Sequence, residues 1–178
     1  MATPGLTIIF LDIDGVLLPF GGERSKSTPE KSCSAIFPDR TIAALTTILK
    51  EFPSSMVVLS STWRVRRDFC EQILQAFSDY AGTHGEELLP TQFYDVTNVD
   101  NHSERQWEIH DWLASSRNID AWVALDDEEL IEGDTNKKYY SEFQNHVVKT
   151  TSHIGLTQRD AQNAVLLLKA QHKKKLND

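Results

Sequence analysis

The sequence predicts an α/β domain of three layers, a doubly wound parallel sheet covered by helices on both faces. Three short apolar runs, Thr7–Leu11, Ser55–Ser60 and Ala121–Leu125, are continuous rather than alternating, which is typical of strands buried on both faces. Segments with helical spacing of apolar residues separate these runs. Strand and helix therefore alternate along the chain, as they do in βαβ units.

The helical segments follow the strands in order, and they cover residues 39–52, 66–77, 103–116 and 157–171. In the first of them we expect Asp39 to be the N-cap and Pro53 to stop the helix. The last begins with Thr157 and Asp160 three residues apart, which is typical of a capping box. After it we expect a flexible basic tail over residues 170–178.

Three long segments interrupt the alternation. Residues 19–38 are rich in Gly, Pro and Ser and directly follow the first strand, so we interpret them as a minimal cap or flap. Residues 83–102 form a polar connection with one short strand expected at 91–96, and residues 128–145 follow the third strand. Because ligands of open α/β sheets bind beyond the carboxyl ends of the strands, the flap is expected beside the functional site.

Length and composition favour one domain over residues 1–178. A weaker fourth strand is expected at residues 146–150. A chain of 178 residues buries a sufficient core without disulfides or a structural metal. Cys33 and Cys70 lie far apart and in no metal-binding spacing, so we expect reduced thiols. No signal-peptide pattern and no apolar run of about 18 residues is present, so we expect a cytoplasmic protein with no membrane partner.

The net charge argues against general binding to nucleic acid. Lys and Arg number 18 against 26 Asp and Glu, which gives a formal charge of −8. Phosphate backbones would then be attracted only by a local basic patch. The six histidines show no metal-binding spacing, so we expect them to be structural.

Polar side chains follow each of the three central strands at the point where the strand ends. They are Asp12 and Asp14 after the first strand, Ser60, Ser61 and Thr62 after the second, and Asp126 and Asp127 after the third. If the strands are neighbours, four carboxylates converge and repel one another unless a cation is present. Mg²⁺ prefers such oxygen ligands together with phosphate oxygens. Either acidic pair alone is also typical of a turn or a helix cap, so it is the combination that predicts a metal and phosphate site.

The same residues resemble the motifs of the haloacid dehalogenase-like (HAD) phosphohydrolases. "FLDIDGVL" is similar to their first motif, "VVLSS" to the second and "VALDD" to the fourth, over Ile8 to Asp127. The wording of "LDIDGVL", "VVLSSTWR", "EIHDWL", "VALDD" and "GLT" resembles more closely the HAD domain of Swiss Army Knife RNA repair proteins. The resemblance implies a Rossmann-like HAD fold and hydrolysis of a phosphomonoester.

The resemblance also implies roles for individual residues. Asp12 would be the nucleophile that forms an aspartyl-phosphate, and Asp14 would be the general acid and base. Gly15 would allow the sharp turn that aims both carboxylates at one phosphate. Ser60 would bind a phosphoryl oxygen through its hydroxyl, with Ser61 as the second choice.

Mg²⁺ would be held, by the same resemblance, by the Asp12 carboxylate, the Asp14 main-chain carbonyl and Asp127, with Asp126 in support. The third motif of the family is a basic residue before the last catalytic strand. No Lys occupies that region, and Arg105 is the candidate, with an ordinary solvated Arg as the alternative. Arg would serve there only as a charge, because it does not release a proton.

Arg64 is a second candidate for phosphate binding, because "STWRVRR" places Trp63 beside three arginines directly after Ser60. Arg64 could hold a second phosphate or a phosphodiester, with Trp63 as a surface on which a base stacks. The alternative is a helix start with solvated arginines and a Trp in the core.

These observations together predict a Mg²⁺-dependent phosphatase whose substrate is a nucleic-acid end, a nucleotide or another phosphomonoester. One alternative is a small-molecule phosphatase, acting on a sugar or nucleotide, in which residues 19–38 close over the substrate. Another is a catalytically silent binding module with the HAD fold. A silent module is expected to have lost Asp12 or Asp14, and both are present.

Overall fold

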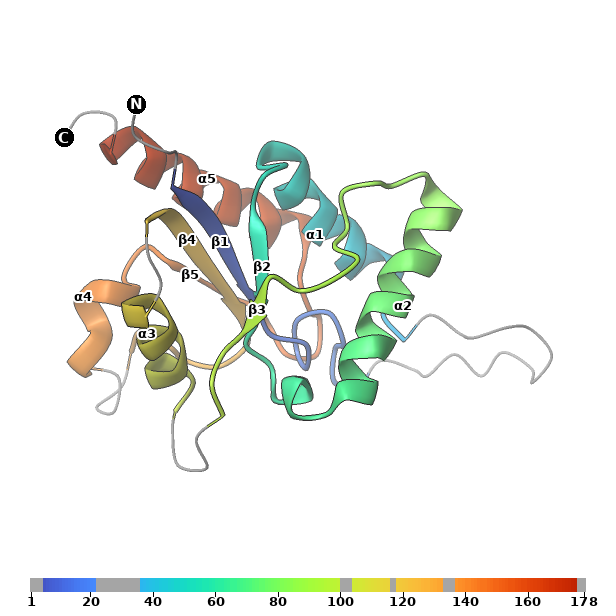
Figure 1. The fold of residues 1–178 in the computed structure, drawn as a ribbon, viewed down its shortest axis with the longest axis horizontal. Coiled ribbons are helices and arrows are strands. Elements are labelled where there is room, and N and C mark those ends of the chain that lie inside the picture. Colours follow the sequence, from blue (N-terminus) through green and yellow to red (C-terminus); the bar gives the residue numbers. More distant parts are fainter. Residues whose placement is uncertain (1–4, 22–35, 100–103, 116–117, 133–136, 176–178) are drawn as a thin grey trace.

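A five-stranded parallel sheet forms the centre of the molecule (Figure 1). The computed structural model describes residues 5–21, 36–99, 104–115, 118–132 and 137–175. The strands are β1 (Leu6–Leu11), β2 (Met56–Leu59), β3 (Asp95–Val96), β4 (Ile119–Asp126) and β5 (Val147–Lys149). Their order is β3-β2-β1-β4-β5, and all four pairings are parallel. The predicted α/β fold is confirmed.

The strand order places a topological switch point between β1 and β4. From β1 the chain moves outward through β2 to β3, and it then returns to the other side of β1 for β4 and β5. The connections on the two sides diverge at that point, and the ligands of open α/β sheets bind at such a point, beyond the carboxyl ends of the strands. Leu11 pairs with Leu125 in this register, so the residues after β1 lie beside the last residue of β4.

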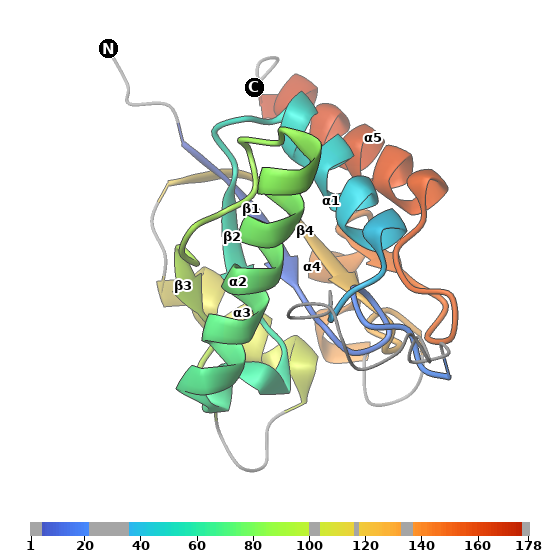
Figure 2. The ribbon, with the colours of Figure 1, turned by 90° about the vertical axis from the view of Figure 1, so that its right-hand side faces the viewer.

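Helices cover both faces of the sheet (Figure 2). The main helices are α1 (Asp39–Glu51), α2 (Arg67–His84), α3 (Arg105–Ser115), α4 (Tyr140–Phe143) and α5 (Gln158–Lys175), and two short 3-10 helices are η1 (Thr62–Val65) and η2 (Lys137–Tyr139). Successive β1 residues point to opposite faces. Ile9 packs in a core with α1, α2 and α5, whereas Phe10 packs in a second core with α3 and α4.

Several helix ends differ from the prediction, and the largest difference is in α2, which runs to His84 rather than ending at residue 77. Asp39 is the first residue of α1 rather than its N-cap, because Pro38 holds the extended N-cap conformation and makes no side-chain capping bond. The capping box of α5 is present as predicted, since Thr157 N donates to Asp160 and Asp160 N donates back to the Thr157 hydroxyl. Its other end extends further than expected, to Lys175.

The extension of α5 has a tertiary cause. His172 stacks on Phe52 at 5.6 Å and lies 3.0 Å from the Thr7 hydroxyl. Gln171 hydrogen bonds to both the N–H and the carbonyl of Trp122. Residues 170–175 are therefore held as helix against the sheet rather than forming a flexible tail.

Part of the predicted flap lies outside the described residues, namely 22–35, and so does Cys33. At its start the Phe20 N–H donates to the Ser152 carbonyl at 2.8 Å, and at its end Phe37 is buried in the core. Cys70 is a free cysteine. None of the described helices is long and apolar enough to cross a membrane.

The packing of Phe10 predicts a large effect on stability. Its ring meets Trp112 edge-on at 5.2 Å and Trp122 at 5.7 Å, and it is fully buried. Phe10→Ala should lower the free energy of unfolding by about 3–5 kcal/mol, measured by denaturant unfolding. Phe20→Ala is the matched control, since that ring is 53% exposed and should cost far less. Equal losses in the two variants would contradict this account of the core.

Candidate active site

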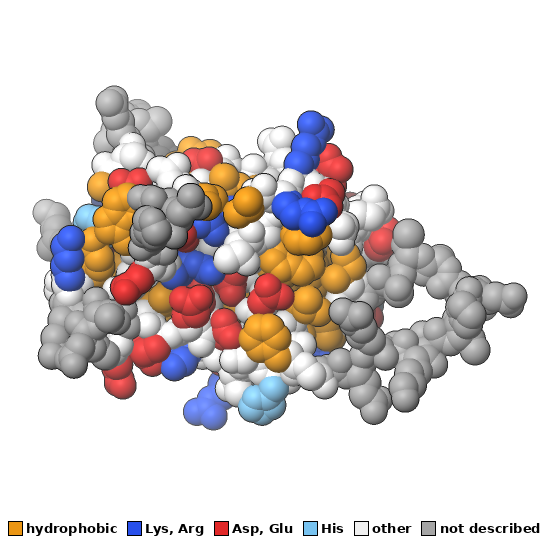
Figure 3. Space-filling view, turned by 90° about the horizontal axis from the view of Figure 1, so that it is seen from below, with side chains coloured by type: hydrophobic (Ala, Val, Ile, Leu, Met, Phe, Trp, Pro, Cys, Tyr) orange, Lys and Arg blue, Asp and Glu red, His pale blue; other side chains and the backbone are white. Residues whose placement is uncertain are grey.

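Three aspartates meet at the switch point of the sheet. One carboxylate oxygen from each of Asp12, Asp126 and Asp127 lies within 4.8 Å of the others. Asp12 and Asp126 are buried and Asp127 is partly buried. Figure 3 views the molecule from below relative to Figure 1 and shows acidic side chains gathered near the centre of that face, next to hydrophobic ones. Three of the four carboxylates expected to converge therefore do so, and the fourth, that of Asp14, is not part of this group.

The turn after β1 depends on Gly15. Its φ is +72°, in the left-handed region that favours glycine. A Cβ at this position would lie 2.3 Å from Asp127 Oδ2. The Gly15 carbonyl also accepts a hydrogen bond of 2.8 Å from the Thr150 hydroxyl, which ties the turn to the end of β5. Any larger residue would displace the Asp127 carboxylate.

Asp14 lies just outside the group of three and has a partner of its own. The Trp63 indole N–H donates to Asp14 Oδ2 at 2.9 Å. Partial burial raises the pKa of Asp14 above its ordinary value; the bond from Trp63 opposes this shift, and the charge of Asp12 adds to it. The protonated form of Asp14 is thereby favoured relative to a solvated aspartate.

Arg105 places a positive charge inside the acidic cluster. Its Nη1 lies 3.1 Å from Asp12 Oδ1 and 2.9 Å from Asp126 Oδ2, and the side chain is 6% exposed. Burial alone would lower the pKa of Arg105, but the charges of Asp126 and Asp12 raise it. Arg105 is therefore not a solvated surface residue, which was the alternative interpretation. It is positioned to balance charge on Asp12.

Asp126 is the most deeply buried acid of the cluster. Its Oδ2 accepts from Arg105, and its Oδ1 accepts from the Glu128 N–H at 3.0 Å. Burial raises its pKa, while Arg105 opposes the rise. Both of its oxygens are thus engaged by the protein, so Asp12 and Asp127 are the acids with oxygens left for another ligand.

The two serines after β2 differ in the state of their hydroxyl groups. Ser60 and Ser61 are both buried. Ser61 Oγ accepts from the Trp63 N–H at 3.4 Å and caps η1. Ser60 Oγ has no hydrogen-bond partner within the described part of the chain. A buried hydroxyl without a partner is costly, so Ser60 is the serine that an external phosphoryl oxygen would satisfy.

Arg64 occupies a different place from the one expected. Its guanidinium donates to four main-chain carbonyls, those of Ser60, Ser61, Thr97 and Asn98. It also pairs with Glu108 Oε1 at 2.7 Å, and the side chain is only 2% exposed. The expectation that Arg64 binds a substrate phosphate is corrected, because its donor groups already have acceptors. The alternative of a solvated arginine is equally excluded by this burial.

Trp63 also differs from the expected stacking surface. Its ring lies 5.0 Å from that of Phe69 and 6.3 Å from that of Phe37, and its N–H is engaged by Asp14. It is therefore packed among aromatic neighbours, as the alternative interpretation expected, but it also contacts the acidic site.

Sequence reasoning missed Glu108, which joins the two buried arginines. Glu108 Oε1 pairs with Arg64, and Glu108 Oε2 lies 3.7 Å from Arg105 Nε. Burial raises the pKa of Glu108 and lowers that of Arg64, and each of these shifts is opposed by the partner's charge. The available signal was the spacing of Arg105 and Glu108, three residues apart on one face of α3.

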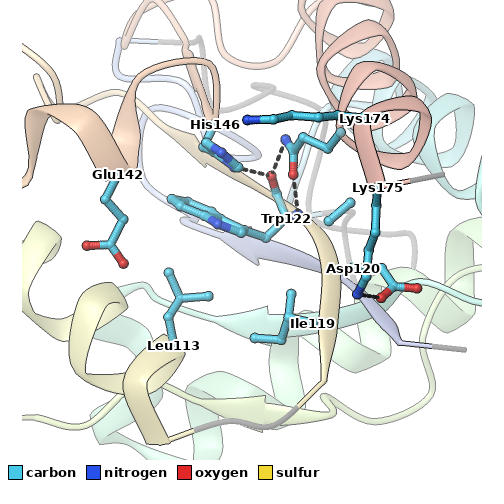
Figure 4. A pocket seen from close by; sticks show the side chains of 10 residues that line it. Leu113, Ile119, Asp120, Trp122, Glu142, His146, Lys174 and Lys175 are labelled. Atoms are coloured by element: carbon cyan, nitrogen blue, oxygen red, sulfur yellow. Dashed lines mark hydrogen bonds and ion pairs between the residues drawn. The ribbon is translucent and has the colours of Figure 1, made fainter. Parts of the chain in front are cut away.

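A separate pocket of about 450 Å³ lies around the first residues of β4, at the other end of that strand from Asp126 (Figure 4). Trp122 and His146 stack at 4.3 Å along its wall. Its polar groups are largely paired with one another, Gln171 with the main chain of Trp122 and Lys175 with Asp120. The three aspartates, Arg105 and the Ser60 hydroxyl lie instead at the carboxyl ends of the strands, which form the candidate active site.

The parallel sheet with aspartates at the ends of β1 and β4 defines an α/β domain of the HAD type. Residues 8–161 match the family model of the HAD domain in Swiss Army Knife RNA repair proteins, and the chain belongs to this family. No curated protein and no solved structure was found to match. The resemblance inferred from the motifs is confirmed, and the family indicates a phosphatase-type function in an RNA-repair context.

The ion pair of Arg64 predicts a strong effect on stability. Arg64→Met leaves Glu108 as a buried charge without its closest partner, so the free energy of unfolding should fall by about 3–5 kcal/mol in denaturant titrations. Arg66→Met is the control two residues away, because Arg66 pairs with Asp68 at the exposed surface and its loss should change little. If Arg64→Met were as stable as the control, the buried pair would not have the structural role described.

Proposed function

We propose that this chain is a Mg²⁺-dependent phosphatase that hydrolyses a phosphomonoester through an aspartyl-phosphate formed at Asp12. The observation that carries the proposal is the placement of Asp12 beside buried Arg105, with Asp14 two residues on and Asp127 facing the same turn. The family match supports the same chemistry. A silent binding module would not need this complete set.

The residues present fit Mg²⁺. The oxygens of Asp12, Asp126 and Asp127 lie within 4.8 Å of one another, and a single guanidinium does not balance three carboxylates. All the available donors are oxygens, which a hard cation prefers. Asp12, Asp127 and the Asp14 carbonyl would hold the ion, and when bound it would screen the repulsion between Asp12 and the substrate phosphate.

In the first proposed step a carboxylate oxygen of Asp12 forms a bond to phosphorus. The bond from phosphorus to the ester oxygen breaks, and that oxygen keeps the electron pair and takes the proton of Asp14. The raised pKa of Asp14 supports its protonated form at this stage. Ser60 Oγ would donate to a phosphoryl oxygen, and Arg105 would hold Asp12 in place and balance its charge.

In the second proposed step water attacks the phosphorus of the aspartyl-phosphate. Asp14, now a carboxylate, takes the proton of the water, and the bond between Asp12 and phosphorus breaks. The products are inorganic phosphate and the free Asp12 carboxylate, and Asp14 is protonated again. One residue thus acts first as acid and then as base.

We propose the terminal phosphate of a nucleic acid as the substrate, on the strength of the family match. A small sugar or nucleotide phosphate is the second candidate. It is favoured by the burial of Arg64, which removes the basic contact that the sequence offered for a polynucleotide backbone, and by the net charge of −8.

A panel of phosphate esters tests the proposal. With Mg²⁺ we expect release of phosphate from 4-nitrophenyl phosphate and from 3′- or 5′-phosphorylated oligonucleotides. Asp12→Asn should lower kcat by about 10³-fold or more, because it removes the nucleophile, and EDTA should abolish turnover. Asp79→Asn, which removes an exposed charge on α2, is the control and should keep full activity.

The outcomes of the panel separate the candidates. Activity that survives Asp12→Asn or EDTA would rule out the proposed mechanism. Turnover of mononucleotides or sugar phosphates without turnover of oligonucleotide ends would favour the small-molecule phosphatase over RNA repair.

The contact between Gly15 and Asp127 gives a second test, of the metal. Asp127→Asn removes a ligand charge, and Gly15→Ala would push the Asp127 carboxylate away. Both should raise the Mg²⁺ concentration for half-maximal activity by about 10–100-fold, measured by Mg²⁺ titration. Gly82→Ala in α2, where a Cβ meets nothing within 4 Å, is the matched control. An unchanged Mg²⁺ requirement in Asp127→Asn would show that Asp127 is no ligand.

A further inference from the structure

The hydrogen bond from Trp63 to Asp14 joins two parts of the chain that sequence reasoning treated separately. Trp63 lies in η1, directly after the serines that follow β2, and Asp14 lies in the turn after β1. The bond runs from the indole Nε1 to Asp14 Oδ2 and is 2.9 Å long. Of the contacts described above, it is the one that fixes the side chain of Asp14.

The backbone around Trp63 is fixed by hydrogen bonds. The main-chain N–H of Trp63 donates to Ser61 Oγ, and the next residue, Arg64, binds main-chain carbonyls and Glu108. The ring also packs against Phe69 at 5.0 Å. The indole N–H is therefore a preorganised donor, because moving it would disturb a buried network.

The hydrogen bond from the indole determines which oxygen of Asp14 is available for proton transfer. The indole N–H donates and accepts nothing, so Asp14 Oδ2 is the acceptor of this bond. The proton that Asp14 transfers is then carried by the other oxygen, Oδ1. On the proposed phosphatase function we infer that Trp63 is a positioning residue: it holds Asp14 so that Oδ1 passes its proton to the ester oxygen and later takes one from water.

This role has a consequence for substrate preference. In an ester of an acidic phenol the leaving group departs as a phenolate anion with little help. In an ester of an ordinary alcohol the leaving oxygen needs a proton as its bond to phosphorus breaks. Loss of the hydrogen bond from Trp63 should therefore slow the hydrolysis of alkyl esters most. Sugar and nucleoside phosphates are alkyl esters, so the Trp63 bond would matter for both substrate candidates.

Three variants and a series of esters test the inference. Trp63→Phe keeps an aromatic ring and removes the N–H. Trp63→His removes bulk but keeps a ring N–H at the corresponding position. Trp112→Phe is the matched control, because the Trp112 indole donates to Asp95 at 2.8 Å outside the acidic cluster. We compare kcat/KM for 4-nitrophenyl, phenyl and benzyl phosphate, with circular dichroism to check folding.

The expected result is a change in leaving-group dependence. Trp63→Phe should lower kcat/KM for benzyl phosphate by at least about 10-fold more than for 4-nitrophenyl phosphate, since positioned acids contribute about 10²–10⁴-fold. Trp63→His should keep more of the benzyl phosphate activity than Trp63→Phe. The Trp112→Phe control should leave the ratio between esters unchanged.

The contrary results are equally defined. One such result is that Trp63→Phe lowers kcat/KM equally for all esters. Another is that Trp63→His has a lower kcat/KM for benzyl phosphate than Trp63→Phe. Either would show that Trp63 acts by packing alone and would overturn the inference, while the phosphatase function would stand. Failure of the wild-type chain to hydrolyse any ester with Mg²⁺ would overturn the proposed function, and the inference with it.

Discussion

The concentration of negative charge at the switch point is the constraint on which the rest of the structure depends. Asp12 and Asp126 are buried next to each other with Asp127 beside them. Buried carboxylates are costly unless they are paired, and like charges at this distance add to the cost. Arg105 supplies one buried positive charge to two of them, so the cluster remains acidic and able to bind a cation.

Placing Arg105 imposes requirements on neighbouring elements. A line of alternating charge runs from Asp126 through Arg105 and Glu108 to Arg64. Arg64 in turn donates hydrogen bonds to four main-chain carbonyls of the residues that directly follow β2 and β3. Through this network the ends of β2, β3 and β4 and the start of α3 are fixed relative to Asp12.

The sequence predicted those features that depend on local pattern. The apolar runs became β1, β2 and β4, and the polar residues at their ends met because parallel strands end at one edge. It did not predict features that depend on distant partners. The acceptors of Arg64 at Thr97 and Asn98 lie more than 30 residues away, and the helical tail depends on Trp122 and Phe52. Local sequence carries no information on such distant contacts. A basic residue just after a phosphate-binding serine therefore predicts phosphate binding, whereas Arg64 is a buried structural residue.

The burial of Arg64 determines how the site would bind a substrate. With Arg64 buried and Arg105 already facing two carboxylates, the positive charge available for a phosphate dianion would come chiefly from Mg²⁺. Substrate and ion would then each raise the affinity of the other, because each supplies the charge that the other lacks. Binding of the phosphate through Mg²⁺ would not distinguish between the alcohols of different esters. The discrimination between esters would consequently fall to the geometry of Asp14, which in this structure is held by Trp63.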